Sequence, residues 1–201
     1  MAVICNIGGA GDMREIGLLF ILAVLGGCTA TYQQSPVIET GATLLPKESI
    51  AISTPENGAY DGKEYSQSGQ MTAQAVKAAF AHFAGDVHVI SECKAIACLR
   101  KDAPAGVAYF VVPEILHWED RVTEWSGIKD KLEVRLSIYG TQGEGPIAST
   151  IISGKSKWMT FGGDHPQDLL AGPINNYVTS VYGGKSKSSD RSGPGLPSDS
   201  H

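Results

Sequence analysis

Residues 107–112 read VAYFVV, a continuous apolar run that is typical of a strand buried on both faces of a sheet. Two shorter segments upstream, 49–53 (SIAIS) and 87–90 (VHVI), also have the composition of strands. Between these three segments, the 3.6-residue apolar period predicts helices over 69–83 and 91–102. Alternating strands and helices predict parallel neighbours joined by right-handed crossovers.

Beyond this run the apolar period changes from helical to two. Residues 132–139 and 146–158 alternate apolar and polar side chains, which predicts hairpin-connected antiparallel strands. A final amphipathic helix is expected between Pro166 and Gly183, interrupted at Gly172. The sequence therefore predicts an α/β (α+β) fold, with a mixed sheet of about five strands in the order β-α-β-α-β-β-β-α and helices packed on the sheet.

Composition fits a single globular domain, which we place at residues 47–183. The 201 residues are 42% hydrophobic and 18% charged, enough apolar material for one core. The formal net charge of −5, without a Lys/Arg cluster, argues against nucleic acid as a partner. Residues 184–201 are rich in Ser, Gly and Pro and predict a disordered tail.

The N-terminus has the pattern of a secretory signal. Residues 16–25, IGLLFILAVL, are ten apolar positions, too few for a spanning helix, which needs about 20, but typical of a signal peptide. The only Arg before them is Arg14, so Met13 is a candidate start. The run ends in Leu25-Gly26-Gly27-Cys28, which resembles a bacterial lipobox, whose Cys carries diacylglycerol; an ordinary cleavage site is the alternative.

The lipobox resemblance implies a lipoprotein held in a membrane by the acyl chains on Cys28. The residue after the Cys is Thr29 and not Asp. By the same resemblance this implies export to the bacterial outer membrane, with the domain facing the periplasm. We therefore expect a signal peptide over 1–27 and a lipidated Cys with a tether over 28–46.

Export also bears on the remaining cysteines, Cys93 and Cys98. An oxidising compartment favours a disulfide between them. Along a continuous helix the two side chains would lie about 140° apart, beyond disulfide reach, so the bridge requires the helix to start after Cys93 or to break near Ala95. Two buried thiols on an unbroken helix are the alternative.

The segment PEILHWEDRVTEWSG at 113–127 concentrates one His, four carboxylates, an Arg and two Trp. If a hairpin turns near Gly127, opposite charges face each other on one side of the strand pair and apolar side chains face each other on the other side. These cross-strand pairs would explain the charged and aromatic residues structurally, without a catalytic role. This register predicts the pairs Glu119 with Arg135, Arg121 with Glu133, Trp118 with Leu136, Leu116 with Ile138, and His117 with Ser137.

Enzyme motifs are absent from the sequence. Neither HExxH nor GxSxG occurs, and a metal set of His117, Glu119 and His165 would need a further firm ligand. We expect no catalytic residue, metal or cofactor. The alternative is a periplasmic hydrolase that uses His117 or His165 with nearby carboxylates.

The predicted topology brings three unusual loops to one end of the sheet. The loops after the first, third and fifth strands all leave the carboxyl end of the parallel strands, where open α/β sheets usually bind ligands. In the alternative, Trp125 and Phe161 pack over the end of the sheet, and Asp164 caps the last helix with Gln167 completing a capping box. The candidate binding rim is Tyr60, Tyr65, Glu124, Trp125, Phe161, Asp164 and His165.

Three long strings carry a family resemblance: PENGAYDGKEYSQSG (55–69), ILHWEDRVTEWSG (115–127) and WMTFGGDHPQDLL (158–170). They resemble a family of bacterial envelope lipoproteins classified only as a domain of unknown function, over most of residues 44–182. The resemblance implies no catalytic residues. The element order is also similar to small α/β domains of envelope lipoproteins that activate or scaffold cell-wall and secretion machinery. We therefore expect a binding or scaffolding module whose partner is an envelope protein or a cell-wall component.

Overall fold

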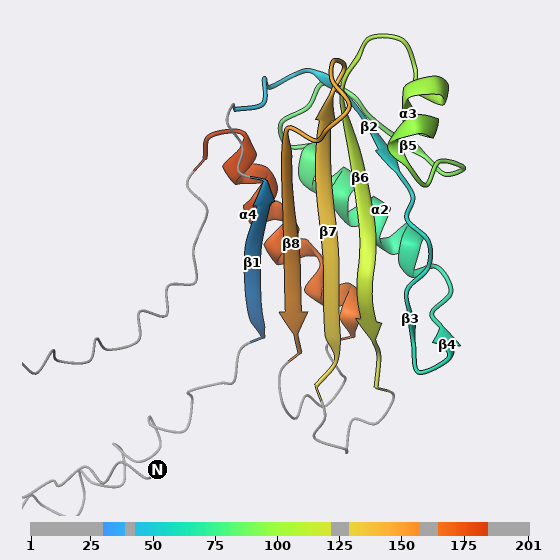
Figure 1. Cartoon of the computed structure of the whole chain (residues 1–201). Helices are drawn as coiled ribbons and strands as arrows, with labels where there is room; N and C mark the ends of the chain where they lie inside the picture. Colours follow the sequence, from blue (N-terminus) through green and yellow to red (C-terminus); the bar gives the residue numbers. More distant parts are fainter. Residues whose placement is uncertain (1–29, 39–42, 122–128, 157–164, 185–201) are drawn as a thin grey trace, which may run out of the picture.

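The computed structural model describes residues 30–38, 43–121, 129–156 and 165–184. Its centre is one mixed sheet with two helices behind it, and a two-stranded hairpin stands beside it (Figure 1). The sheet strands are β1 (Thr31–Ile38), β2 (Ser49–Ser53), β5 (Val87–Ile90), β6 (Val107–Glu119), β7 (Lys131–Gly140) and β8 (Ala148–Lys155). The hairpin consists of β3 (Ala59–Tyr60) and β4 (Lys63–Glu64).

The predicted strand directions are confirmed. β2 lies between β5 and β6 and runs parallel to both, β7 is antiparallel to β6, and β8 is antiparallel to β7. The strand order is β1-β8-β7-β6-β2-β5. The carboxyl ends of β2, β6 and β8 therefore lie at one end of the sheet, the lower end in Figure 1.

The sheet has six strands rather than about five, because β1 forms inside the segment expected to be a tether. Residues Thr31–Ile38 pair antiparallel with β8, so β1 is an edge strand. Pro36 within it is tolerated because one side of an edge strand forms no ladder hydrogen bonds. Sequence alternation did not mark this strand, since seven of its eight residues are exposed and it buries no apolar face.

Helices cover one face of the sheet and form the main core. α2 (Ser68–Phe80) and α4 (Ala171–Val181), the latter preceded by the 3-10 turn η2 (Pro166–Leu169), pack there against Ile52, Val134 and Leu136. Gly172 does not interrupt the last helix, because it lies in the first turn of α4. Within the described residues, no helix has the length and apolar character needed to cross a bilayer.

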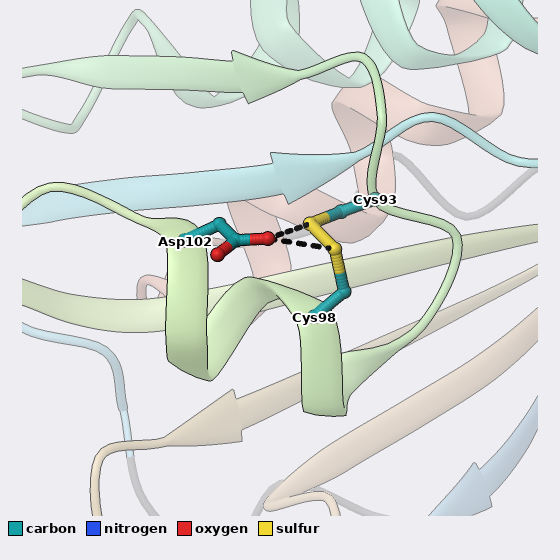
Figure 2. The surroundings of a disulfide bond; sticks show 3 residues. All are labelled: Cys93, Cys98 and Asp102. Carbon is teal, nitrogen blue, oxygen red and sulfur yellow. Dashed lines mark hydrogen bonds between the residues drawn. A yellow bond between two sulfur atoms is a disulfide. The ribbon is translucent and has the colours of Figure 1, made fainter.

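A shorter helix, α3 (Ile96–Asp102), lies against part of the other face. Leu99 packs there with Ala51 and Phe110 in a second, smaller core. The disulfide between Cys93 and Cys98 ties the start of this helix to the chain after β5 (Figure 2). The bridge can close because α3 begins at Ile96, after Cys93, which leaves the two Cα atoms 5.3 Å apart.

The predicted β6–β7 register is wrong by about four residues. Arg135 lies opposite Glu114, and Glu119 lies opposite Lys131, so none of the predicted pairs forms. The observed pairs centre the hairpin on position 125 instead of Gly127, and a bulge between Ile115 and His117 shifts the register once more. The expected placement of opposite charges across the hairpin is nevertheless found, with other partners.

Candidate functional site

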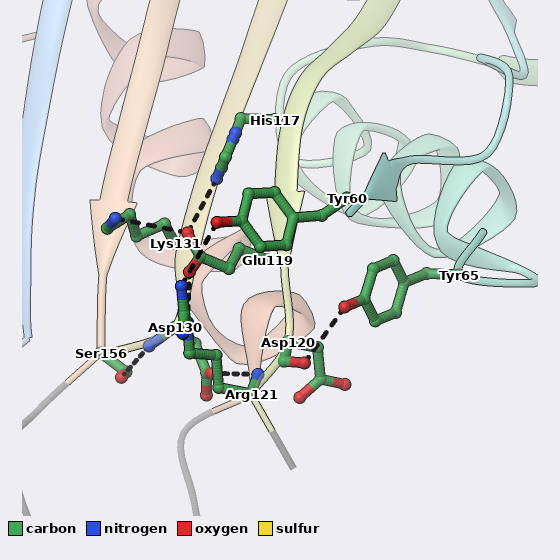
Figure 3. A network of polar contacts seen from close by, with 9 residues as sticks. All are labelled: Tyr60, Tyr65, His117, Glu119, Asp120, Arg121, Asp130, Lys131 and Ser156. Atoms are coloured by element: carbon green, nitrogen blue, oxygen red, sulfur yellow. Dashed lines mark hydrogen bonds and ion pairs between the residues drawn. The ribbon is translucent and has the colours of Figure 1, made fainter. Parts of the chain in front are cut away.

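Glu119 is the centre of a polar network at the carboxyl end of β6 (Figure 3). Its side chain is only 1% exposed. Its carboxylate accepts hydrogen bonds from His117 Nε2 at 3.0 Å and from Arg121 Nε, and Lys131 Nζ lies 3.3 Å from Oε2. A buried carboxylate is tolerated only when it is satisfied in this way.

The ionised form of Glu119 is the favoured one. Burial by itself would raise the pKa of this carboxyl, but the hydrogen bonds from His117, Arg121 and Lys131 together lower the pKa below its ordinary value. The carboxyl end of β6 therefore carries a buried negative charge at Glu119, surrounded by basic side chains.

Tyr60, from the β3–β4 hairpin, packs onto this network. Its ring contacts His117 edge-on with centroids 5.2 Å apart, and its hydroxyl accepts a hydrogen bond from Arg121 Nη2 at 3.3 Å. The Arg121 guanidinium also lies over the Tyr60 ring, 5.7 Å from the centroid. The hairpin after β2 is thus joined to the end of β6.

Asp120 joins two further segments to the same end of the sheet. Tyr65 donates its hydroxyl proton to the Asp120 carbonyl at 3.1 Å, and His165 Nδ1 lies 3.2 Å from Asp120 Oδ1. That hydrogen bond, opposed by partial burial and aided by the charge of Asp120, raises the pKa of His165 above its ordinary value. His165 is also the N-cap residue directly before η2, and its N–H donates to Asp168 Oδ2 at 3.1 Å.

Asp130, which directly precedes β7, is the third acidic residue at this end of the sheet, beside Glu119 and Asp120. It accepts the Arg121 backbone N–H at 2.6 Å, and its own N–H donates to Ser156 Oγ at 2.9 Å. Burial raises its pKa, against the lowering effect of the Arg121 N–H. Asp120, Asp130 and His165 offer oxygen and nitrogen ligand atoms within 4.8 Å of one another, a set that could hold a divalent cation.

Three of the predicted rim residues, Tyr60, Tyr65 and His165, are brought together at the end of β6. The other four, together with Cys28, lie outside the described residues: Glu124, Trp125, Phe161 and Asp164. Sequence reasoning missed Asp120 and Asp130. Their signal was charge at the two strand ends beside a turn, but the predicted ladder gave neither residue a partner or a role.

A family model for a domain of unknown function, DUF4823, matches residues 42–181. The chain belongs to this family. No curated protein matches the sequence.

The solved structures similar to this DUF4823 domain include the PelC dodecamer from Paraburkholderia phytofirmans. The match has a TM-score of 0.56 and 13% sequence identity, and covers 78% of this chain and 99% of PelC. A point variant of the same PelC matches with a TM-score of 0.55 and 14% identity, over 77% of this chain and 98% of that one. The Xanthomonas campestris protein XCC0632, of family DUF330, is more distant, with a TM-score of 0.44 and 12% identity over 74% of this chain and 91% of that one. The two PelC matches show that the DUF4823 domain shares the fold of PelC.

The two histidines of the DUF4823 site use different carboxylates. His117 bonds to Glu119 and His165 bonds to Asp120. Glu119 and Asp120 are consecutive residues, and Glu119 is held by two further basic groups. Each histidine therefore has its own carboxylate partner, and the described contacts form two separate His–carboxylate pairs.

Proposed function

We propose that this DUF4823 protein is an outer-membrane-anchored periplasmic lipoprotein whose rim binds another component of the cell envelope without catalysing a reaction. One observation carries the binding part of this proposal. Tyr60, Tyr65 and His165 come from separate segments and gather at the end of β6, the carboxyl end of the parallel strands.

The contacts of the rim favour binding because they fix its side chains before a partner arrives. Arg121 donates a hydrogen bond to the Tyr60 hydroxyl, and the Asp120 carbonyl accepts one from the Tyr65 hydroxyl. These two bonds limit the motion of both rings. Partly exposed aromatic rings that are already ordered lose little side-chain entropy on binding. Large aromatics of this kind often supply much of the binding energy at an interface.

The fold supports a scaffolding role in a second way. PelC, which has a similar fold, assembles as a dodecamer. A chain of this architecture can therefore serve as a building block in a larger assembly. The identity with PelC is only 13%, so the partner of this chain is to be found by experiment.

The anchor rests on the lipobox at Leu25-Gly26-Gly27-Cys28. Acylation of Cys28 would hold the domain on the membrane more firmly than a single acyl chain can. Thr29 after the Cys supports the outer membrane as the destination.

The experiment is quantitative crosslinking in intact envelopes, followed by purification of the crosslinked species. Tyr60→Ala should remove the partner adducts, because it deletes a rim ring, while the melting temperature changes little. His82→Ala is the matched control, since His82 is an exposed aromatic residue in the turn after α2, at the opposite end of the sheet. Equal adduct yields in wild type, Tyr60→Ala and His82→Ala would contradict the rim proposal.

Acylation is tested separately with Cys28→Ala. This variant should lose incorporation of labelled palmitate and should no longer fractionate with outer membranes. Retention of both properties would show that the chain is not a lipoprotein of this kind.

A further inference from the structure

The described part of the chain begins almost at the lipobox. Only Thr29 and Ala30 separate Cys28 from Thr31, the first residue of β1. A chain spans at most about 3.6 Å per residue, so the Cα atom of Cys28 lies within about 11 Å of the Cα atom of Thr31. Of the segment expected to be a tether (28–46), only residues 28–30 precede the sheet.

The start of β1 lies at the same end of the sheet as the rim. Thr31 is directly opposite Lys155, the last residue of β8, and Lys155 is directly opposite Lys131, the first residue of β7. Lys131 is in turn opposite Glu119. These four residues form one row across four neighbouring strands, which are spaced about 4.8 Å apart. The anchor therefore leaves the domain from the end that carries the rim.

The charged side chains at this end of the sheet differ in how far they are exposed to solvent. Lys155 is exposed, and the Lys131 side chain is 46% exposed. Of the carboxylates nearby, Glu119 is 1% exposed and Asp130 is 8% exposed, whereas the Asp120 side chain is 22% exposed and Asp168 is exposed. The chain as a whole is acidic, yet within the row of Thr31, Lys155, Lys131 and Glu119 the charged side chains that reach outward are the two lysines.

We propose that the carboxyl end of the sheet lies against the bilayer and that Lys131 and Lys155 contact the phosphate groups of phospholipids. The proposal rests on the acylation of Cys28 in the proposed function, and it names the component that the rim meets first. With so short a connection, the acyl chains in the membrane place the row of Thr31, Lys155 and Lys131 at headgroup level. Lysine ammonium groups near an anionic lipid surface are attracted to it.

The experiment places a photo-crosslinking amino acid at Lys155 or at Thr31 in the full-length acylated protein, in isolated envelopes with radiolabelled phospholipid. Glu144 and Lys101 are the matched controls, both exposed. Glu144 lies in the turn between β7 and β8, before the first residue of β8 and therefore at the opposite end of that strand from Lys155. The readout is phospholipid covalently attached to the purified protein.

Lys155 and Thr31 should acquire several-fold more phospholipid than Glu144 and Lys101. A flexible Gly/Ser spacer inserted between Thr29 and Ala30 should reduce labelling at Lys155 towards the control level, because the domain can then leave the surface. Equal phospholipid labelling at all four positions, or an adduct at Lys155 that contains protein instead of lipid, would overturn the inference. In that case palmitate on Cys28 would still uphold the proposed anchor, whereas its absence would overturn both.

Discussion

Lys131 lies directly opposite Glu119 across the β6–β7 pair, with Nζ 3.3 Å from the Oε2 of a carboxylate that is buried almost completely. His117 and Arg121 reach the same carboxylate from β6 and the residues after it. The segment 117–121 (HWEDR) is therefore built around one buried acid, and His117 and Arg121 act first as partners of that acid.

Glu119→Ala should destabilise the domain by about 3 kcal/mol, the lower end of what removing one partner of a buried ion pair costs, because Lys131 and Arg121 remain partly solvated. Urea unfolding measures the loss. Glu114→Ala is the control, because Glu114 is exposed and its pair with Arg135 should contribute less than about 1 kcal/mol. Similar losses for the two variants would contradict the central role of Glu119.

Exchanging Glu114 and Arg135 should be tolerated. Arg135 Nη1 lies 2.7 Å from Glu114 Oε2 across the strands, and both side chains are at least a third exposed. Glu114→Arg or Arg135→Glu alone places like charges opposite each other and should lower stability by roughly 0.2–1 kcal/mol, and the double exchange should restore it. A double variant no more stable than the worse single variant would argue against this register.

Period and composition predicted the fold well because the parallel strands and their helices bury continuous apolar faces. The run at 107–112 and the alternation at 132–139 both became strands in the expected directions. β1 was not predicted because it buries no apolar face. As an exposed edge strand with Pro36, it is held by backbone pairing with β8, which leaves no periodic apolar signal.

The candidate site was harder to predict, because register depends on turn length. Alternation alone cannot distinguish pairings that differ by an even number of residues, since such a shift keeps every side chain on its face. Glu119 was accordingly given Arg135 instead of Lys131, and its burial was not foreseen. The convergence of Tyr60, Tyr65 and His165 could be predicted, because it follows from strand direction alone.

The pKa of His165 should lie above the ordinary value of a histidine, about 6.5, because its hydrogen bond to Asp120 and the charge of that carboxylate favour the imidazolium. Since the pKa is raised in the folded state, this contribution to stability is fully present below the unfolded pKa and is lost as the pH rises through the folded pKa. NMR titration of the imidazole resonances measures the midpoint. Asp120→Asn should shift it back towards 6.5, and a midpoint that this variant leaves unchanged would exclude Asp120 as the cause.

Two glycines should respond oppositely to alanine. A Cβ at Gly58 would lie 2.5 Å from Trp118 Cβ and 3.0 Å from Ile115 Cγ2, so Gly58→Ala should destabilise by roughly 1–3 kcal/mol through overpacking. Gly172 lies in α4, and a Cβ there meets nothing within 4 Å. Gly172→Ala should stabilise the protein by about 0.5–1 kcal/mol, because alanine is the better helix former. Thermal unfolding compares them, and losses of equal size would contradict the predicted contacts.

The last prediction concerns the disulfide and the acid beside it. Asp102 Oδ2 lies 3.4 Å from Cys98 Sγ and 3.9 Å from Cys93 Sγ (Figure 2). A carboxylate at this distance repels an attacking thiolate and disfavours the thiolate that leaves, so it should slow reduction of the bridge. Maleimide labelling of protein purified without reductant should find neither cysteine free, and both should become reactive on reduction.

Asp102→Asn should therefore speed up reduction by dithiothreitol several-fold, because it removes the charge and keeps the shape. Asp86→Asn is the control, since Asp86 is an exposed acid before β5 that is not part of the bridge. The labelling rate under limiting reductant measures the effect. Equal rates for the two variants would show that the Asp102 charge does not protect the bridge, and two reactive thiols before reduction would show that the bridge itself is absent in the mature protein.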